Sequence, residues 1–155
     1  YPIFEKAFNA WTDCKDGACR DDGWAATGEG GSSLDVFEAE LGAQPKNHRL
    51  DRFHHRPEAL VDLLEGALEA GEPLVAYTHG KGHEARYRDT GLSAWHTYAV
   101  LGLERGPGDP RVRLYNPWGR GEHGDDGEDD GVFEMGLDDF MKLFRNVNVA
   151  RDPQV

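Results

Sequence analysis

Two stretches decide the fold of this chain: Trp95-His96-Thr97-Tyr98-Ala99-Val100 and Leu114-Tyr115-Asn116-Pro117-Trp118-Gly119. Apolar, β-branched and aromatic residues alternate with other types along this part of the chain, as is typical of β-strands, whose side chains point alternately to the two faces of a sheet. The run Pro107-Gly108-Asp109-Pro110 between them is a turn signal. We therefore predict a hairpin with strands at Trp95–Glu104 and Arg111–Tyr115.

This hairpin brings one histidine and one asparagine together. His96 stands near the start of the first strand and Asn116 follows the second, so antiparallel pairing places them side by side. A histidine whose ring is oriented by an asparagine supplies two members of a thiol-protease triad, in which the third is a nucleophilic cysteine. His96 and Asn116 are therefore the candidate catalytic residues.

The same residues resemble a known family. The pattern His96-x-Tyr98-x-Val100, followed by Arg113-x-x-Asn116-Pro117-Trp118-Gly119, is similar to the calpain-type, papain-like cysteine peptidases. Further blocks resemble that family and occur in its order: Tyr1–Phe8, Gly30–Ser33, Asp130–Met135 and Leu137–Phe140. The resemblance covers residues 1–150, as the second half of the catalytic core, and leaves 151–155 as a tail.

The fold we expect is α+β, with an antiparallel, partly barrel-like β-sheet and packed helices, as in the second catalytic subdomain of that family. Its strands are predicted at Pro73–Thr78, Trp95–Glu104, Arg111–Tyr115, Val132–Met135 and Asn146–Val149. Its helices are predicted at Pro2–Thr12, Ser33–Leu41, Pro57–Ala70 and, at an edge, Leu137–Phe144. The segment Ala43–Arg56 is predicted to be irregular.

Start and stop signals delimit two of these helices. Pro57 suits a first helical turn, and Gly71 ends a run whose apolar residues recur at helical spacing. Ser32 or Ser33 can cap the preceding helix, which Gly42 ends. We expect three residues of that helix to face inward: Leu34, Phe37 and Leu41.

The resemblance implies a mechanism to which this chain contributes part. His96 takes the proton of the cysteine thiol, giving a thiolate–imidazolium pair, and Asn116 accepts a hydrogen bond from the His96 ring and aims it. Trp118 is expected to cover that hydrogen bond and exclude water. One position departs from the family, because Trp95 stands where the family commonly has glycine, and a side chain of this size is expected to narrow or fill the cleft.

The nucleophile itself is missing. In the family the cysteine lies upstream of the block that Tyr1–Phe8 resembles, and neither Cys14 nor Cys19 opens an apolar-periodic helix of the kind that activates such a thiol. The spacing of these two cysteines permits a local disulfide in an oxidising compartment, and two free thiols are the alternative. We therefore expect the catalytic cysteine on an upstream or separate segment, and this chain alone to be inactive.

An acidic, glycine-rich segment follows the hairpin, at Arg120–Gly131. It is either a solvated loop or a calcium site, because Ca²⁺ prefers hard oxygen ligands on a flexible loop. The resemblance implies calcium ligands at Glu122 and Asp130, although Val132 stands where the family has an acidic residue. The peptidase chemistry itself needs no cofactor.

The segment His79–Gly91 is predicted to be a polar loop. The resemblance implies that three of its side chains border the substrate: His79, His83 and Arg86. The spacing His79-x-x-x-His83 mimics a helical zinc pair, but the intervening Gly-Lys-Gly disfavours a helix, so zinc is not expected there.

Composition narrows the function further. The length of 155 residues suits one domain, and the net charge of −12 argues against binding to nucleic acid or to an anionic membrane. No apolar run has transmembrane length, there is no signal peptide, and the start at Tyr1 indicates processing or a cut. We expect a soluble protein, and the acidic composition fits a secreted effector.

Two functions follow from these residues. In the first, the chain is the His/Asn-bearing part of a calpain-like cysteine endopeptidase that hydrolyses peptide bonds of a protein substrate, with a Cys-bearing segment as its partner. In the second, it is a non-catalytic calpain-like interaction module that binds a partner through the face where the first half of the core would dock, and calcium is a candidate ligand of this module.

Overall fold

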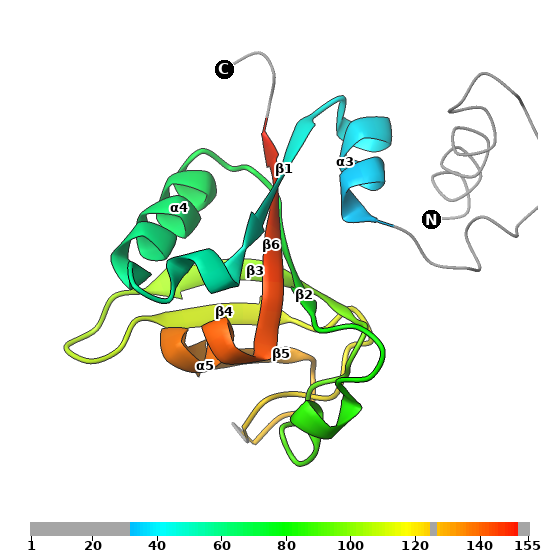
Figure 1. Ribbon diagram of the computed structural model, residues 1–155, viewed down its shortest axis with the longest axis vertical. Coiled ribbons are helices and arrows are strands. Elements are labelled where there is room, and N and C mark those ends of the chain that lie inside the picture. The colour runs from blue at the N-terminus through cyan, green and yellow to red at the C-terminus, as the bar shows by residue number, and fades with distance from the viewer. Residues whose placement is uncertain (1–31, 125–126, 152–155) are drawn as a thin grey trace, which may run out of the picture. The chain divides into compact units, whose positions relative to one another are not determined.

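The computed structural model describes residues 32–124 and 127–151 (Figure 1). The predicted helix Pro2–Thr12 and both cysteines lie outside the described residues. The chain divides into two compact units, Tyr1–Lys46 with Ala150–Val155 and Asn47–Val149. Helix α3 (Ser33–Leu41) belongs to the first unit, and the candidate site lies within the second. The domain limits 1–150 and 151–155 remain a prediction.

The described residues form one six-stranded sheet, in the order β1-β6-β2-β3-β4-β5. Its strands are β1 (Gln44–Arg49), β2 (Leu74–Thr78), β3 (Thr97–Glu104), β4 (Arg111–Tyr115), β5 (Val132–Gly136) and β6 (Phe144–Arg151). The pairings of β2 with β3 and β6, of β3 with β4, and of β4 with β5 are antiparallel. Together with the helices, this sheet confirms the predicted α+β class.

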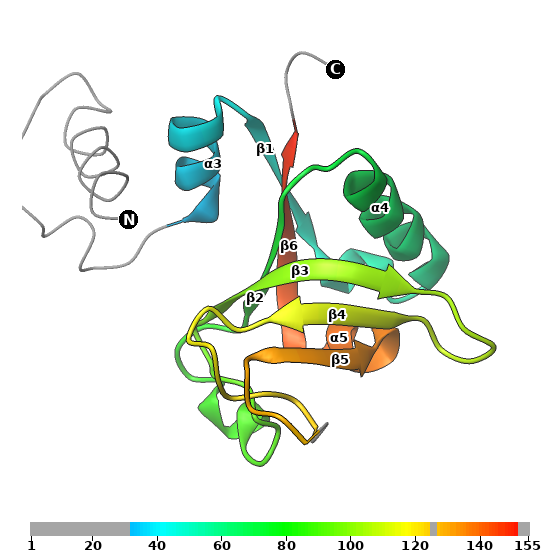
Figure 2. The same ribbon diagram turned by 180° about the vertical axis from the view of Figure 1, so that it is seen from behind.

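Helices α4 (Pro57–Glu69) and α5 (Leu137–Leu143) cover one face of strands β3 to β5 (Figure 1). Seen from behind, these strands lie in front of α5, and β6 runs across their direction, so the sheet is strongly curved along β2 (Figure 2). Alternation along β4 turns Val112 and Leu114 inward and Arg111 and Arg113 outward. The fully buried side chains of this core include Leu60, Val61, Leu64, Tyr98, Val112, Leu114, Met135 and Phe140.

Most predicted boundaries agree with the structure to within a few residues. Ser32 caps α3, because its Oγ accepts a hydrogen bond from the backbone N–H of Leu34 at 3.2 Å, and Gly42 ends the helix with φ of 60°. The inward position predicted for Leu41 is wrong. That residue is 54% exposed, since the helix ends there and Ala43, just beyond the turn, is buried in its place.

Strand β1 was not predicted, since residues 43–56 were expected to be irregular. Its sequence has no apolar alternation, and none of its six residues is buried. It is held as a strand by its neighbour β6 and by a side-chain hydrogen bond from Asn47 Nδ2 to Asn148 Oδ1 at 2.6 Å. Strand β6 is correspondingly longer than expected. No helix among the described residues is long and apolar enough to cross a membrane.

Candidate active site

The hairpin of β3 and β4 brings His96 and Asn116 together as the sequence predicts. His96 directly precedes β3, Asn116 directly follows β4, and the pairing of Ala99 with Tyr115 sets the register between them. The distance from His96 Nε2 to Asn116 Oδ1 is 2.9 Å, which is that of a hydrogen bond. That this pair is catalytic remains a hypothesis.

The amide of Asn116 is fixed by its other hydrogen bonds. The side chain is 1% exposed, and its Nδ2 donates to the backbone carbonyls of Arg120 at 2.6 Å and Gly121 at 3.0 Å. Its Oδ1 therefore faces His96 and can only accept, so His96 Nε2 carries the proton of the neutral ring. The other ring nitrogen, Nδ1, makes no hydrogen bond with any described residue and is left as a proton acceptor.

Two aromatic rings hold the imidazole in place. The indole of Trp118 stacks on the His96 ring at a centroid distance of 4.0 Å and an interplanar angle of 30°. The buried ring of Tyr98 meets His96 edge to face at 4.8 Å. Trp118 is nevertheless 61% exposed, so the face turned away from His96 lies open to solvent. The ring of His96 is thus fixed by two aromatic contacts and by its hydrogen bond to Asn116.

A threonine that the sequence analysis did not single out anchors the backbone of His96. Thr78, the last residue of β2, accepts a hydrogen bond from His96 N to its Oγ1 at 2.9 Å and donates its own N–H to His96 O at 3.0 Å. Its hydroxyl also lies 2.8 Å from Ser93 O. The only sequence signal was a hydroxyl residue at the end of the apolar run Leu74–Tyr77, which is too common to indicate a site.

Trp95, the residue before the histidine, has a glycine-like backbone. Its φ is 55°, in the left-handed region that costs a residue with a Cβ about 1 kcal/mol or more. The residue is 67% exposed, and its indole lies against Gly80, where an added Cβ would come within 2.8 Å of the ring. Lys81 Nζ stands 5.4 Å from the ring centroid. A glycine at this position would adopt the same backbone conformation without this strain.

We expect Trp95→Gly to be more stable than Trp95→Ala by about 1 kcal/mol in the free energy of unfolding. Both variants lose the indole and its contacts, but only alanine keeps the left-handed strain. Urea denaturation of the two variants measures the difference. An alanine variant as stable as the glycine variant would show that residue 95 does not hold this backbone conformation in solution.

Backbone hydrogen bonds shape the loop that follows Asn116. Asn116 N donates to Gly131 O at 2.8 Å, and Gly119 N donates to Asn116 O at 2.9 Å. Gly131 has φ of 87°, and a Cβ there would come within 2.8 Å of Asn116 O, so only glycine fits without a shift. The loop therefore closes directly behind the asparagine.

The two predicted calcium ligands both take part in this loop. Glu122 Oε1 accepts a hydrogen bond from Gly131 N at 2.6 Å, and Asp130 Oδ1 accepts one from Val132 N at 2.8 Å. Among the described residues, no group of three or more His, Cys, Asp or Glu side chains could hold a metal ion. Asp125 and Asp126 lie outside those residues, so the calcium site remains a prediction.

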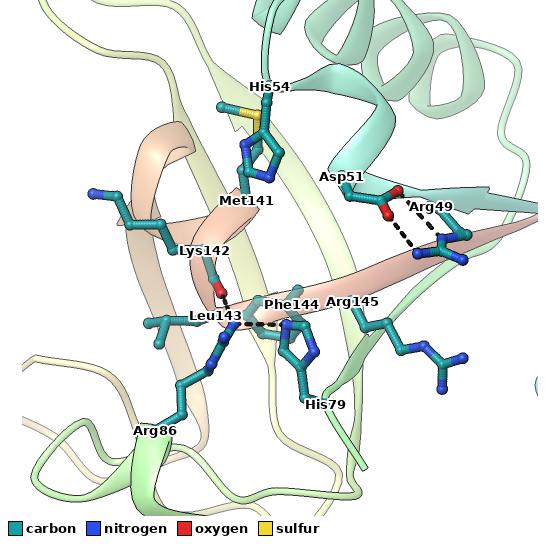
Figure 3. Close-up of a pocket in the computed structure, with 10 residues that line it drawn as sticks. All are labelled: Arg49, Asp51, His54, His79, Arg86, Met141, Lys142, Leu143, Phe144 and Arg145. Atoms are coloured by element: carbon teal, nitrogen blue, oxygen red, sulfur yellow. Dashed lines mark hydrogen bonds and ion pairs between the residues drawn. The ribbon is translucent and has the colours of Figure 1, made fainter. Parts of the chain in front are cut away.

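The loop after β2 is tied to the end of α5. It contains the 3₁₀ turn η2 (Glu84–Tyr87), and the buried Tyr87 hydroxyl donates to Leu143 O at 2.7 Å while accepting from His79 N at 2.6 Å. Arg86 Nη1 lies 2.9 Å from both His79 Nε2 and Lys142 O (Figure 3). His79 and His83 have ring centroids 5.2 Å apart. His79 thus accepts from a guanidinium, which requires an unprotonated Nε2.

Burial lowers the pKa of His79 below its ordinary value of 6.5, and the charges of Arg86, His83 and Arg145 lower it further. The unfolded chain therefore binds a proton at this position before the folded chain does. The contribution of His79 to the free energy of unfolding is complete above pH 6.5 and is lost as the pH falls through the pKa of the folded state.

We expect the free energy of unfolding to decrease between pH 7.5 and 5.5, and this decrease to be smaller in His79→Gln. Urea denaturation at both pH values measures it, and equal decreases in the two proteins would contradict the assignment.

No protein-family model matches the chain. Among solved structures, the chain is similar to that of SERA5E from Plasmodium falciparum, with a TM-score of 0.46 and 14% sequence identity. The match covers 69% of this chain and 46% of SERA5E, so the chain spans less than half the length of that protein. A similarity of this degree does not establish a common function, which has to be argued from the site itself.

Proposed function

We propose that this chain is the His/Asn-bearing part of a calpain-like cysteine endopeptidase, with the nucleophilic cysteine on another segment. The observation that carries this proposal is the hydrogen bond of 2.9 Å between His96 Nε2 and Asn116 Oδ1. Because Asn116 can only accept there, the free nitrogen of His96 is Nδ1, which can take a proton from a thiol that comes within hydrogen-bond distance of it.

The chemistry follows from these positions. When a cysteine thiol reaches Nδ1, proton transfer gives a thiolate and an imidazolium that keeps its Nε2–H bond to Asn116. Trp118 lies face-on against that ring at 4.0 Å, and the face of an indole stabilises a cation. The thiolate attacks the peptide carbonyl, His96 gives its proton to the leaving amine, and the same residue then activates the water that hydrolyses the acyl-enzyme.

The surface around His96 supports completion by a second segment. The resemblance puts neither cysteine of the chain, Cys14 or Cys19, at the position of the nucleophile. Two large aromatic side chains beside His96 are widely exposed, Trp95 at 67% and Trp118 at 61%. Exposed apolar groups that flank a polar site are typical of surfaces that another segment or a substrate covers.

The test uses the protein from its natural source, with every segment that co-purifies. Casein hydrolysis is expected, and iodoacetamide, which alkylates the cysteine thiolate, is expected to abolish it. Stimulation by calcium would support the proposed ligands Glu122 and Asp130. A preparation that is inert toward casein with and without calcium would overturn the peptidase proposal and leave the non-catalytic interaction module.

A further inference from the structure

A cavity of about 540 Å³ lies on the side of the loop after β2 where Arg86 meets α5 (Figure 3). Three segments far apart in the sequence line it: the stretch around the 3₁₀ turn η1 (Leu50–Phe53), the loop after β2, and the junction of α5 with β6. Its polar and charged lining residues are Arg49, Asp51, His54, His79, Arg86, Lys142 and Arg145. Neither His96 nor Asn116 lines it, whereas His79 and Arg86, for which the resemblance implies a place beside the substrate, do.

Positive charge in this cavity is only partly compensated. Asp51 forms an ion pair with Arg49, whose guanidinium holds the pKa of that carboxyl below its usual range. Lys142 is paired with Asp139 at 3.1 Å. The other two cations have no carboxylate partner among the described residues, because the Arg86 guanidinium bonds to neutral acceptors and the Arg145 side chain makes no hydrogen bond or ion pair with a described residue. Two uncompensated guanidinium groups therefore face one cavity in a chain whose net charge is −12.

We propose that this cavity binds a phosphate group, held by Arg86, Arg145 and the protonated ring of His79. Arginine presents planar forks of N–H donors that match the oxygens of a phosphate, and the dianion supplies the charge that the two guanidinium groups lack. In Figure 3 the ring of His79 lies between the side chains of Arg86 and Arg145. The cavity is large enough for a phosphate group with a small substituent.

His79 is the lining residue through which binding of the phosphate group depends on pH. The charged and titratable groups that face it are His83 and Arg86 on its own loop, Lys142 in the last turn of α5, Arg145 at the start of β6, and Arg49, Asp51 and His54 from the segment around η1. Without an anion the cations favour its neutral ring. A bound dianion reverses this preference, so a proton and the anion bind together.

Isothermal titration with inorganic phosphate at pH 7.0 and constant ionic strength tests the site. Arg145→Gln removes a side chain that no described residue needs for its own hydrogen bonds, and we expect it to raise the Kd at least about fivefold. Arg88→Gln is the matched control, because it removes the same charge from the loop after β2, outside the cavity, and is expected to leave the Kd within about twofold. Equal effects of the two variants, or no saturable binding to the unmodified protein, would overturn the proposal.

A second titration uses sulfate, whose charge stays at −2 across the pH range. We expect its Kd to decrease at least about threefold from pH 7.5 to 5.5 in the unmodified protein and to stay constant in His79→Gln. A decrease that persists in the variant would exclude His79 as the coupled group.

A titration with phosphoserine distinguishes a phosphorylated ligand from free phosphate. Tighter binding of phosphoserine points to a phosphorylated ligand, and tighter binding of the inorganic ion points to free phosphate. These measurements do not depend on peptidase activity, so the site and the proposed function succeed or fail separately.

Discussion

If the proposed peptidase is assembled with its cysteine-bearing segment, its His96→Ala variant is expected to lose at least about 10³-fold in kcat/KM toward casein-derived peptides. Without the imidazole there is no acceptor for the thiol proton and no donor for the leaving amine, so both halves of the reaction are slowed. Steady-state hydrolysis of a fluorogenic peptide measures the loss.

The matched control is His55→Ala, which removes an exposed histidine from the turn before α4 and is expected to change kcat/KM by less than about twofold. A His96→Ala enzyme that keeps more than about a tenth of the activity would show that another group acts as the base. Equal losses in both variants would indicate a general loss of structure instead of the removal of the proposed base.

Asn116→Ala is expected to reduce the free energy of unfolding by about 2–4 kcal/mol. The side chain is 1% exposed and takes part in hydrogen bonds to the His96 ring, to Trp118 N, and to the carbonyls of Arg120 and Gly121. Removing it leaves several buried or half-buried polar groups without partners. Urea denaturation, with the m-value checked for constancy, measures the change.

The Asn116→Asp variant distinguishes the role of the acceptor Oδ1 from that of the donor Nδ2. The carboxylate keeps an acceptor for His96 and for Trp118 N, but it sets a negative oxygen against the carbonyls of Arg120 and Gly121, which accept from Nδ2 at 2.6 and 3.0 Å in the unmodified protein. We expect this variant to be at least as destabilised as Asn116→Ala. An aspartate variant with the stability of the unmodified protein would show that the Nδ2 donors contribute nothing, and the reason for placing the free nitrogen of His96 at Nδ1 would be lost.

The hairpin and the pairing of His96 with Asn116 could be predicted because every signal for them is local. The alternation of apolar residues indicates the strands, and the run Pro107 to Pro110 indicates the turn. Antiparallel pairing of the two strands then brings His96 beside Asn116. The irregularity in register between Val100 and Gly102 could not be predicted, since nothing in those residue types demands it. This irregularity does not affect the pairing of His96 with Asn116, because Ala99 remains paired with Tyr115 on the side of the strands where the site lies.

Other features depend on contacts that no local pattern encodes. Strand β1 carries no buried residue, so the pattern that identifies half-buried strands was absent from it. Leu41 occurs at helical spacing from Leu34 and Phe37, but it is the last residue of α3 and its side chain is exposed there. The cationic cavity joins residues from three segments separated by roughly 25 to 60 positions, and only the tertiary structure places Arg86 and Arg145 in one lining.

The sequence also predicted that Asn116 orients the ring of His96, and the structure adds that Nδ1 is the ring nitrogen left free. That choice follows from Asn116 Nδ2, which donates to two carbonyls in a loop closed by Gly131. Thr78 adds a second constraint by fixing the backbone of His96 from β2. Both constraints come from residues distant in sequence from the histidine, and neither could be assigned before the fold was known.

The central claim is that Nδ1 of His96 activates a cysteine thiol supplied by another segment. The measurement that tests it most directly is the rate of iodoacetamide alkylation at pH 6, followed by intact mass and peptide mapping, on the natively expressed protein and its His96→Ala variant. We predict one rapidly labelled cysteine, outside residues 1–155, whose labelling slows at least about tenfold in the variant because the thiolate is no longer paired with an imidazolium. The claim would be contradicted if no cysteine outside this chain reacted rapidly, or if one did so at the same rate without His96.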